Sequence, residues 1–212
     1  MISTNQFIVT SMEYYVPKSE VIFEEEIKKS RFITYIRHTN GIEEAKAFLA
    51  EMRATYPDAR HHCWATVAGT PNDSQQYGFT DDGEPQGTAG KPMLNHLLGS
   101  GLGEISVVVV RYFGGIKLGP GGLVRAYGNG VQQALLQVEK RRKVIRKSYR
   151  LQCEYDQFNS LQNLLESMDI EIYDQQFSDK IVIELGINPN ELEAIQQAIT
   201  ERFSGQLALI EI

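Results

Sequence analysis

The sequence predicts an α+β fold whose last third forms a ferredoxin-like domain. Two observations lead to this prediction. Strand and helix patterns alternate in the order βαββαβ from residue 149 onward, and a buried strand earlier in the chain passes through a glycine-rich turn into a helix. The chain has 212 residues, with 42% apolar and 23% charged residues, so disordered and collagenous classes are excluded and one large or two small domains are expected.

The C-terminal elements follow from the periodicity of their apolar residues. Asp156 is expected to cap the first helix, and Pro189 suits the first position of the second helix because it has no N–H group to leave unpaired. Gly205 ends that helix. The predicted elements are a strand, a helix, two strands, a helix and a strand over residues 149–155, 156–168, 170–177, 180–187, 189–204 and 206–212.

The N-terminal two-thirds mixes helical and strand periodicity around a polar segment. Residues 69–90 are rich in Gly, Pro, Asp, Asn, Gln and Thr without apolar periodicity, which predicts a long exposed loop, a type of segment that is often functional. The other predicted elements are a strand at 31–38, a helix from Ile42 to before Pro57, a strand at 61–68, a helix at 92–98, a buried strand at 105–113 and a helix at 123–138.

The net charge of −6 conceals three blocks of different sign. Residues 1–135 carry −2, residues 136–150 carry +6 and residues 151–212 carry −10. The basic block is either the solvated end of a helix and a connector, or a contact for a phosphate backbone. Its candidate nucleic-acid-binding residues are Lys140, Arg141, Arg142 and Lys143.

The glycine-rich turn reads RYFGGIKLGPGGLVRAY over residues 111–127. Glycines leave backbone N–H groups uncovered, and a helix start adds partial positive charge, so this turn resembles a phosphate cradle, although it is not a Walker sequence. The alternative is a tight packing turn whose arginines pair with local carboxylates. The candidate phosphate-binding residues are Arg111, Gly114, Gly115, Lys117, Gly119, Gly121, Gly122 and Arg125.

An acidic segment, residues 80–92, precedes this turn in the chain. Three carboxylates within four residues suit Mg²⁺ or acid–base chemistry, whereas the alternative is ordinary turn chemistry that neutralises the basic residues of the glycine-rich turn. We predict no metal or other cofactor here, with Mg²⁺ as the one ion that the carboxylates suit. The candidate ligand site consists of His62, Asp81, Asp82 and Glu84.

The two cysteines, Cys63 and Cys153, form no CxxC motif, and the four histidines do not complete a zinc site with them. On a strand, His61 and Cys63 would share one face, but a nucleophile pair needs more than this proximity, and no catalytic residue is assigned. Residues 1–6 lack the basic and apolar regions of a signal peptide, and no apolar run could span a membrane, which predicts a cytoplasmic protein.

The turn sequence at 111–127, together with HHCWA at 61–65 and DDGEPQGTAGKP at 81–92, resembles the YigZ/IMPACT family over nearly the whole chain. The resemblance implies an N-terminal domain at 1–138, a basic connector at 139–148 and a C-terminal domain at 149–212. It implies a left-handed βαβ architecture for the first domain, similar to the second domain of a small-subunit ribosomal protein. The C-terminal domain is similar to the ferredoxin-like domain V of elongation factor G.

Three functions are compatible with these residues. The first is a non-enzymatic protein that binds nucleic acid or the ribosome and regulates translation, with RNA or translation factors as partners, as the resemblance implies. The second is an enzyme or binder acting on a phosphorylated small molecule at the glycine-rich turn. The third is a protein-interaction module whose acidic C-terminal domain docks a basic partner.

Overall fold

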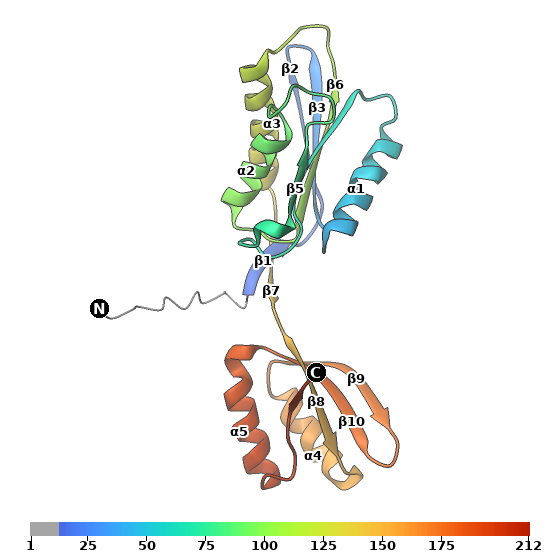
Figure 1. The fold of residues 1–212 in the computed structure, drawn as a ribbon, viewed down its shortest axis with the longest axis vertical. Helices are drawn as coiled ribbons and strands as arrows, with labels where there is room; N and C mark the ends of the chain where they lie inside the picture. The colour runs from blue at the N-terminus through green and yellow to red at the C-terminus, as the bar shows by residue number, and fades with distance from the viewer. Residues whose placement is uncertain (1–12) are drawn as a thin grey trace, which may run out of the picture. The chain divides into compact units, whose positions relative to one another are not determined.

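The structure of the protein is a computed structural model that describes residues 13–212. Residues 1–6, on which the signal-peptide argument depends, lie outside this range. The chain divides into two compact units, one that spans Tyr14–Lys143 and one that contains Val144–Ile212 (Figure 1). No helix of the described residues is long and apolar enough to cross a membrane.

The first unit contains a five-stranded antiparallel sheet in the order β2-β3-β6-β4-β5 and a two-stranded ribbon of β1 and β7. Strands β3 and β4 both pair with β6, which lies between them, and α1 connects them as the crossover of a βαβ unit. The elements are β1 (Glu13–Pro17), β2 (Val21–Ile27), β3 (Ser30–His38), α1 (Ile42–Thr55), β4 (His61–Val67), β5 (Tyr77–Thr80), α2 (Gly90–Ser100), β6 (Ile105–Tyr112), α3 (Pro120–Leu135) and β7 (Lys140–Val144).

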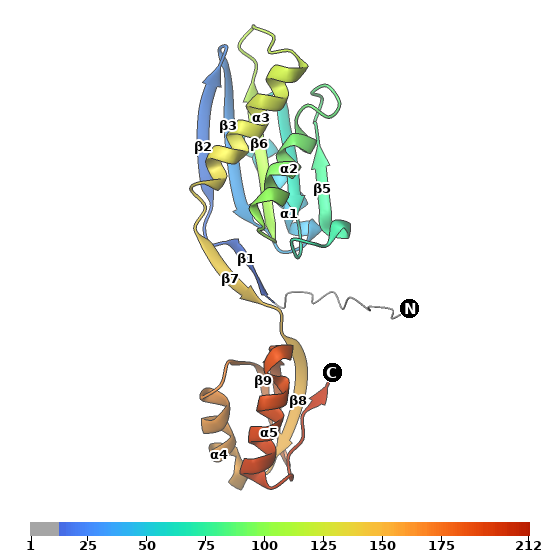
Figure 2. The ribbon, with the colours of Figure 1, turned by 90° about the vertical axis from the view of Figure 1, so that its left-hand side faces the viewer.

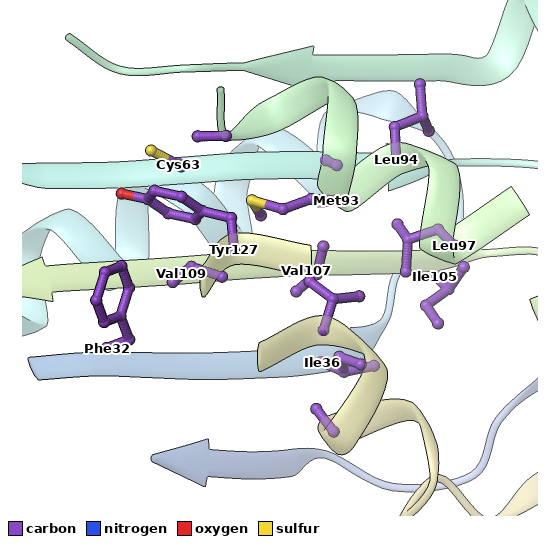
Figure 3. Packing of buried hydrophobic residues seen from close by; sticks show 14 of the residues in the cluster. Phe32, Ile36, Cys63, Met93, Leu94, Leu97, Ile105, Val107, Val109 and Tyr127 are labelled. Carbon is purple, nitrogen blue, oxygen red and sulfur yellow. The ribbon is translucent and has the colours of Figure 1, made fainter. Parts of the chain in front are cut away.

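Helices cover both faces of this sheet, with α1 on one face and α2 and α3 on the other (Figures 1 and 2). Because side chains alternate along a strand, β6 sends Val107 and Val109 to one face and Val108 and Val110 to the other. Figure 3 shows Tyr127 of α3 packed over the first of these faces. A strand buried on both faces reads as the continuous apolar run that the sequence shows at this point.

The structure differs from several expected elements and boundaries in this unit. The segment 69–90 is not a loop throughout, because Ser74–Gln76 forms a 3₁₀ turn and β5 follows it. Strand β2 is not among the expected strands. It lies at the sheet edge and contains a run of glutamates, so its sequence shows little apolar alternation. Helices α2 and α3 begin earlier than expected, at Gly90 and Pro120, because glycines in their first turns discourage a helix prediction.

The basic cluster is not a helix end. Helix α3 stops at Leu135, and residues Lys140–Val144 form the strand β7. The expectation that this block is the solvated end of a helix is therefore wrong.

The second unit is a four-stranded antiparallel sheet in the order β11-β8-β10-β9 with two helices, which confirms the ferredoxin-like prediction. Glu154, not Asp156, is the N-cap of α4, where it forms a capping box with Gln157. The last strand is shorter than expected. The elements are β8 (Lys147–Cys153), α4 (Tyr155–Glu166), β9 (Ile170–Phe177), β10 (Ile181–Ile187), a 3₁₀ turn (Pro189–Glu191), α5 (Leu192–Phe203) and β11 (Ile210–Glu211).

Candidate anion-binding site

The glycine-rich turn joins the end of β6 to the start of α3. The N-cap of α3 is Gly119, whose φ of 75° is in the left-handed region that favours glycine, and no side chain of the described residues accepts an N–H of the first turn. The first helical hydrogen bond runs from the Leu123 N–H to the Gly119 carbonyl, and Pro120 has no N–H group. Gly121 lies before this first bond, so its N–H at the positive end of the helix has no partner within the helix, and a Cβ at this position would meet open space.

A cavity of about 410 Å³ opens beside this helix start. The glycine-rich turn contributes Lys117 and Gly119 to its lining, as well as Phe113, which directly follows β6. Arg60 comes from the segment before β4. Glu84 of the acidic segment lines the same cavity. The acidic and glycine-rich segments therefore meet in space, although about 30 residues separate them in the chain.

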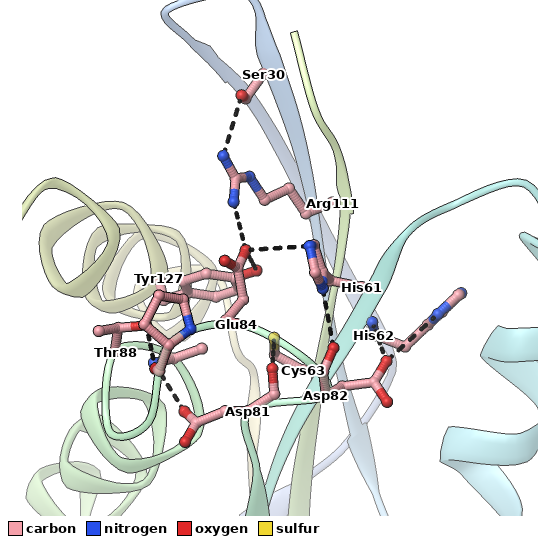
Figure 4. Close-up of polar contacts among 12 residues, drawn as sticks. Ser30, His61, His62, Cys63, Asp81, Asp82, Glu84, Thr88, Arg111 and Tyr127 are labelled. Atoms are coloured by element: carbon pink, nitrogen blue, oxygen red, sulfur yellow. Dashed lines mark hydrogen bonds and ion pairs between the residues drawn. The ribbon is translucent and has the colours of Figure 1, made fainter. Parts of the chain in front are cut away.

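A buried polar cluster lies next to this cavity (Figure 4). The Arg111 guanidinium donates to Glu84 Oε1 over 2.5 Å, and the Tyr127 hydroxyl donates to the same oxygen over 2.8 Å. Arg111 also donates a longer hydrogen bond to Ser30. Its buried Nε has no hydrogen-bond partner among the described residues. Burial, the thiol of Cys63 and the Glu84 charge raise the pKa of Tyr127, so the hydroxyl stays protonated and remains a donor.

His61 lies between this cluster and the acidic segment. Its Nδ1 is 2.9 Å from the Asp82 carbonyl oxygen, and because a carbonyl only accepts, Nδ1 carries the proton of the neutral ring. The other ring nitrogen, Nε2, then has a free lone pair and lies 4.0 Å from Glu84 Oε1. His61 therefore presents Nε2 to the cavity that it lines.

The three carboxylates of the acidic segment do not converge. Asp81 accepts the backbone N–H groups of Gly87, Ala89 and Gly90 and so holds the start of α2. Asp82 accepts the backbone N–H of His62 and an arginine of α1. Because Glu84 is paired within the buried cluster, each carboxylate has separate partners, and these residues do not fit a Mg²⁺ site. No group of three or more His, Cys, Asp or Glu side chains in residues 13–212 could hold a metal ion.

The strand that carries His62 and Cys63 alternates as expected. His62 faces the α1 side, where its ring nitrogen contacts the Tyr56 carbonyl, and Cys63 is buried on the opposite side. Burial raises the pKa of the Cys63 thiol, and nearby carboxylates add to the shift. A fully buried thiol that stays protonated is a poor nucleophile.

The candidate phosphate-binding residues separate into different environments. Lys117 lines the cavity beside Arg111, whereas Arg125 and Gly122 line a second, more open cavity of about 660 Å³ between α3 and the β2–β3 turn. Gly114 is a packing residue, because a Cβ there would lie 1.9 Å from the Lys29 carbonyl oxygen. The sequence therefore groups side chains that the structure distributes over two cavities and a packed turn.

The cations of β7 also differ from one another. Lys143 pairs with Glu104, a buried carboxylate that also accepts from Tyr14 and contacts His38. Lys140, Arg141 and Arg142 are exposed at the surface of the ribbon. The exposed cations of this cluster are therefore those of residues 140–142.

Among the lining residues, Arg60, His61 and Phe113 are missing from the site predicted from the sequence. Phe113 directly follows β6. The register of the sheet places His61 directly opposite Arg111 across the β4–β6 pair, and Arg60 directly precedes His61. The signal that could have found them is the assignment of β4 and β6 as neighbouring strands, since residues opposite each other in a pair lie close together.

The fold and this cavity define a two-domain α+β protein with a basic, partly apolar cavity at a helix start in its first unit and a ferredoxin-like second unit. Comparison with known proteins gives the family. Residues 28–135 match the Impact N-terminal domain, and residues 151–206 match a domain of unknown function, DUF1949. The chain belongs to the IMPACT family.

Relatives in several bacteria match over most of the chain. An IMPACT family member of Haemophilus influenzae is 59% identical, covering 93% of this chain and 96% of the relative. IMPACT family member YigZ of Escherichia coli is 50% identical, covering 94% and 98%, and YvyE of Bacillus subtilis is 33% identical, covering 91% and 88%. A solved structure titled as an hypothetical protein is 50% identical, covers 94% of this chain and 97% of its own, and superposes with a TM-score of 0.75.

Proposed function

We propose that this protein is a cytoplasmic, non-enzymatic RNA-binding protein that acts on translation, and that the cavity at the start of α3 holds an RNA phosphate. The observation that carries the proposal is the uncapped start of α3 beside Lys117 and Arg60, neither of which makes an ion pair among the described residues. A helix start and two cations favour a negatively charged group.

The charge of the cavity supports an anionic ligand. Glu84 is the one carboxylate in the lining, and Arg111 already neutralises it. Lys117 and Arg60 therefore leave the cavity with a positive charge. The exposed cations of residues 140–142 add sequence-independent attraction to a phosphate backbone, which weakens as salt rises.

Binding of labelled structured RNA at several salt concentrations tests this proposal. We expect the affinity of the wild type to fall steeply as the salt concentration rises. In the double variant Arg60→Ala with Lys117→Ala, the slope of log affinity against log salt concentration should decrease by the equivalent of roughly one to two phosphate contacts. The control, Lys46→Ala with Lys91→Ala, removes the same charge from exposed positions on α1 and α2 and should retain the wild-type slope. Arg111 is kept intact because its loss would leave Glu84 unpaired.

A triple alanine variant at residues 140–142 separates the surface cluster from the cavity. It keeps Lys143, whose pairing with Glu104 is structural. Absence of RNA binding below about 100 μM at low salt, weaker than ordinary non-specific affinity, would contradict the proposal. Co-sedimentation with ribosomes at low salt tests whether the ribosome or a translation factor is the partner.

A second candidate is a binder of a phosphorylated small molecule. The volume of about 410 Å³ favours it, because small-ligand pockets have volumes of about 300–1,000 Å³. The same cavity brings Glu84 and Lys117 together, as this function requires. A thermal-shift screen with phosphorylated metabolites, repeated with Lys117→Ala, tests this candidate.

A further inference from the structure

We propose that the cavity accepts one unstacked nucleotide, with its base against Phe113 and its phosphate at the start of α3. This inference deepens the proposed function, on which it rests, by naming single-stranded nucleotides rather than duplex as the ligand. The shared chemistry is a nucleoside phosphate, which either the end of an RNA strand or a free nucleotide supplies.

The base contact is assigned to Phe113 because this ring is both accessible and fixed. Its residue is 43% exposed although it directly follows the buried strand β6, and it lines the cavity. The Arg111 guanidinium lies 5.6 Å from the centroid of the ring, and Glu84 holds that guanidinium in place. An exposed aromatic side chain among cations is the usual stacking surface for an unpaired base.

The phosphate position is assigned by comparison with the other glycine-rich helix start of the same domain. At α2, the carboxylate of Asp81 accepts the N–H groups of Ala89 and Gly90, so an internal anion satisfies that helix. At α3, the N-cap is a glycine, and no side chain in residues 13–212 accepts an N–H of the first turn, while Lys117 and Gly119 line the cavity. An external anion at α3 would make the contacts that Asp81 makes at α2.

Arg111 provides an independent indication of a ligand. Its side chain is 5% exposed and lines the cavity, yet its buried Nε has no partner in the described part of the chain. Buried donors are nearly always paired in proteins, so the unpaired N–H beside the cavity is a donor that the described residues leave unsatisfied. The cavity thus combines an apolar ring with donors for an anion, which is the chemistry of a nucleotide.

Duplex RNA does not offer this combination. Its bases are stacked within the helix and present no free face to Phe113, and protein side chains contact its backbone and shallow groove instead. Only a loop, an end or a free nucleotide can place one base and one phosphate in a cavity of this size.

The test measures the affinity of three probes for the full chain: a single-stranded RNA hexamer with a 5′ phosphate, a blunt RNA duplex, and adenosine monophosphate. Phe113→Ala should weaken hexamer binding by about 5- to 160-fold, the range for loss of one stacked base, and should leave duplex binding unchanged. Phe113→Trp should retain hexamer binding. The control is Phe79→Ala, which removes a ring of similar exposure, 48%, from β5 and should bind as the wild type does.

The outcomes separate the inference from the proposed function. If RNA binds and depends on Lys117 but Phe113→Ala binds the hexamer as the wild type does, the nucleotide inference is overturned and the proposed function stands. A second outcome is that adenosine monophosphate binds, that Phe113→Ala and Lys117→Ala weaken its binding, and that neither the hexamer nor the duplex binds. The inference then stands with a free nucleotide as the ligand, and the proposed function fails. If no probe binds, both fail. Circular dichroism of Phe113→Ala checks that the fold is retained.

Discussion

Arg111 and Glu84 form an ion pair in which the two side chains are only 5% and 4% exposed. The pair joins the central strand β6 to the acidic segment, and the Tyr127 hydroxyl adds a third contact from α3. Removal of one charge from such a pair leaves the other buried without compensation. The pair therefore fixes the acidic segment against the sheet, and it leaves Arg60 and Lys117 as the charges that a ligand meets.

Glu84→Gln should destabilise the protein by about 3 to 5 kcal/mol, because the Arg111 guanidinium would stay buried without its counter-charge. The matched control is Glu24→Gln, since Glu24 pairs with Arg31 at the surface with both side chains about half exposed. It should cost about 1 kcal/mol or less. Urea unfolding of both variants measures the difference. Equal losses in the two variants would show that the buried pair does not stabilise the fold.

The glycines of the turn divide into a packing residue and an accessible residue. Gly114→Ala would place a Cβ against the Lys29 carbonyl, and the backbone must shift to relieve this clash, so the free energy of unfolding should fall by about 2 kcal/mol or more. Gly121→Ala meets open space at the start of α3 and should change stability by less than about 1 kcal/mol. Thermal unfolding measures both, and a tolerated Gly114→Ala would contradict this packing role.

The C-terminal domain could be predicted from sequence because its strands alternate cleanly. In β8, Leu151 and Cys153 are buried while Arg150 and Gln152 are exposed, which is the pattern of a sheet with one covered face. The order of elements then leaves few possible topologies. In the N-terminal domain, by contrast, the edge strands β2 and β5 are short or polar and give little periodicity.

The cavity could be predicted only in part. The glycine-rich turn and Glu84 are visible as local motifs, but the position of Arg60 depends on the pairing of β4 with β6, which no local pattern reveals. The partners of Asp81 and Asp82 are equally non-local. The sequence therefore predicts which segments matter, whereas the sheet register decides which side chains meet.

Asp81 should act as the cap of α2 rather than as a metal ligand. Asp81→Ala removes acceptors for the N–H groups of Gly87, Ala89 and Gly90, and we expect a loss of about 2 kcal/mol. Asp81→Asn keeps one acceptor oxygen and should lose less. The control is Asp73→Ala, which removes an exposed cap from a single 3₁₀ turn and should cost under about 1 kcal/mol. Urea unfolding with and without added Mg²⁺ measures the stability losses of the three variants. A gain in wild-type stability on addition of Mg²⁺ that Asp81→Ala abolishes would contradict the capping role.

His62 should make the stability of the protein depend on pH. Burial lowers the pKa of His62 in the folded state, although the Tyr56 carbonyl opposes the shift, so the unfolded chain binds a proton at a higher pH than the folded protein does. Stability is then full above the ordinary pKa of 6.5 and falls as the pH drops from there toward the folded pKa, by at most about 1.4 kcal/mol per pH unit. Unfolding free energies between pH 5 and 8 should show this decline in the wild type and a shallower one in His62→Gln. Glu104 does not contribute to the change between pH 5 and 8. Its burial raises its pKa, but hydrogen bonds from Lys143, Tyr14 and His38 outweigh the burial and lower the pKa below 4.5. An identical pH dependence in wild type and variant would show that His62 does not titrate differently on folding.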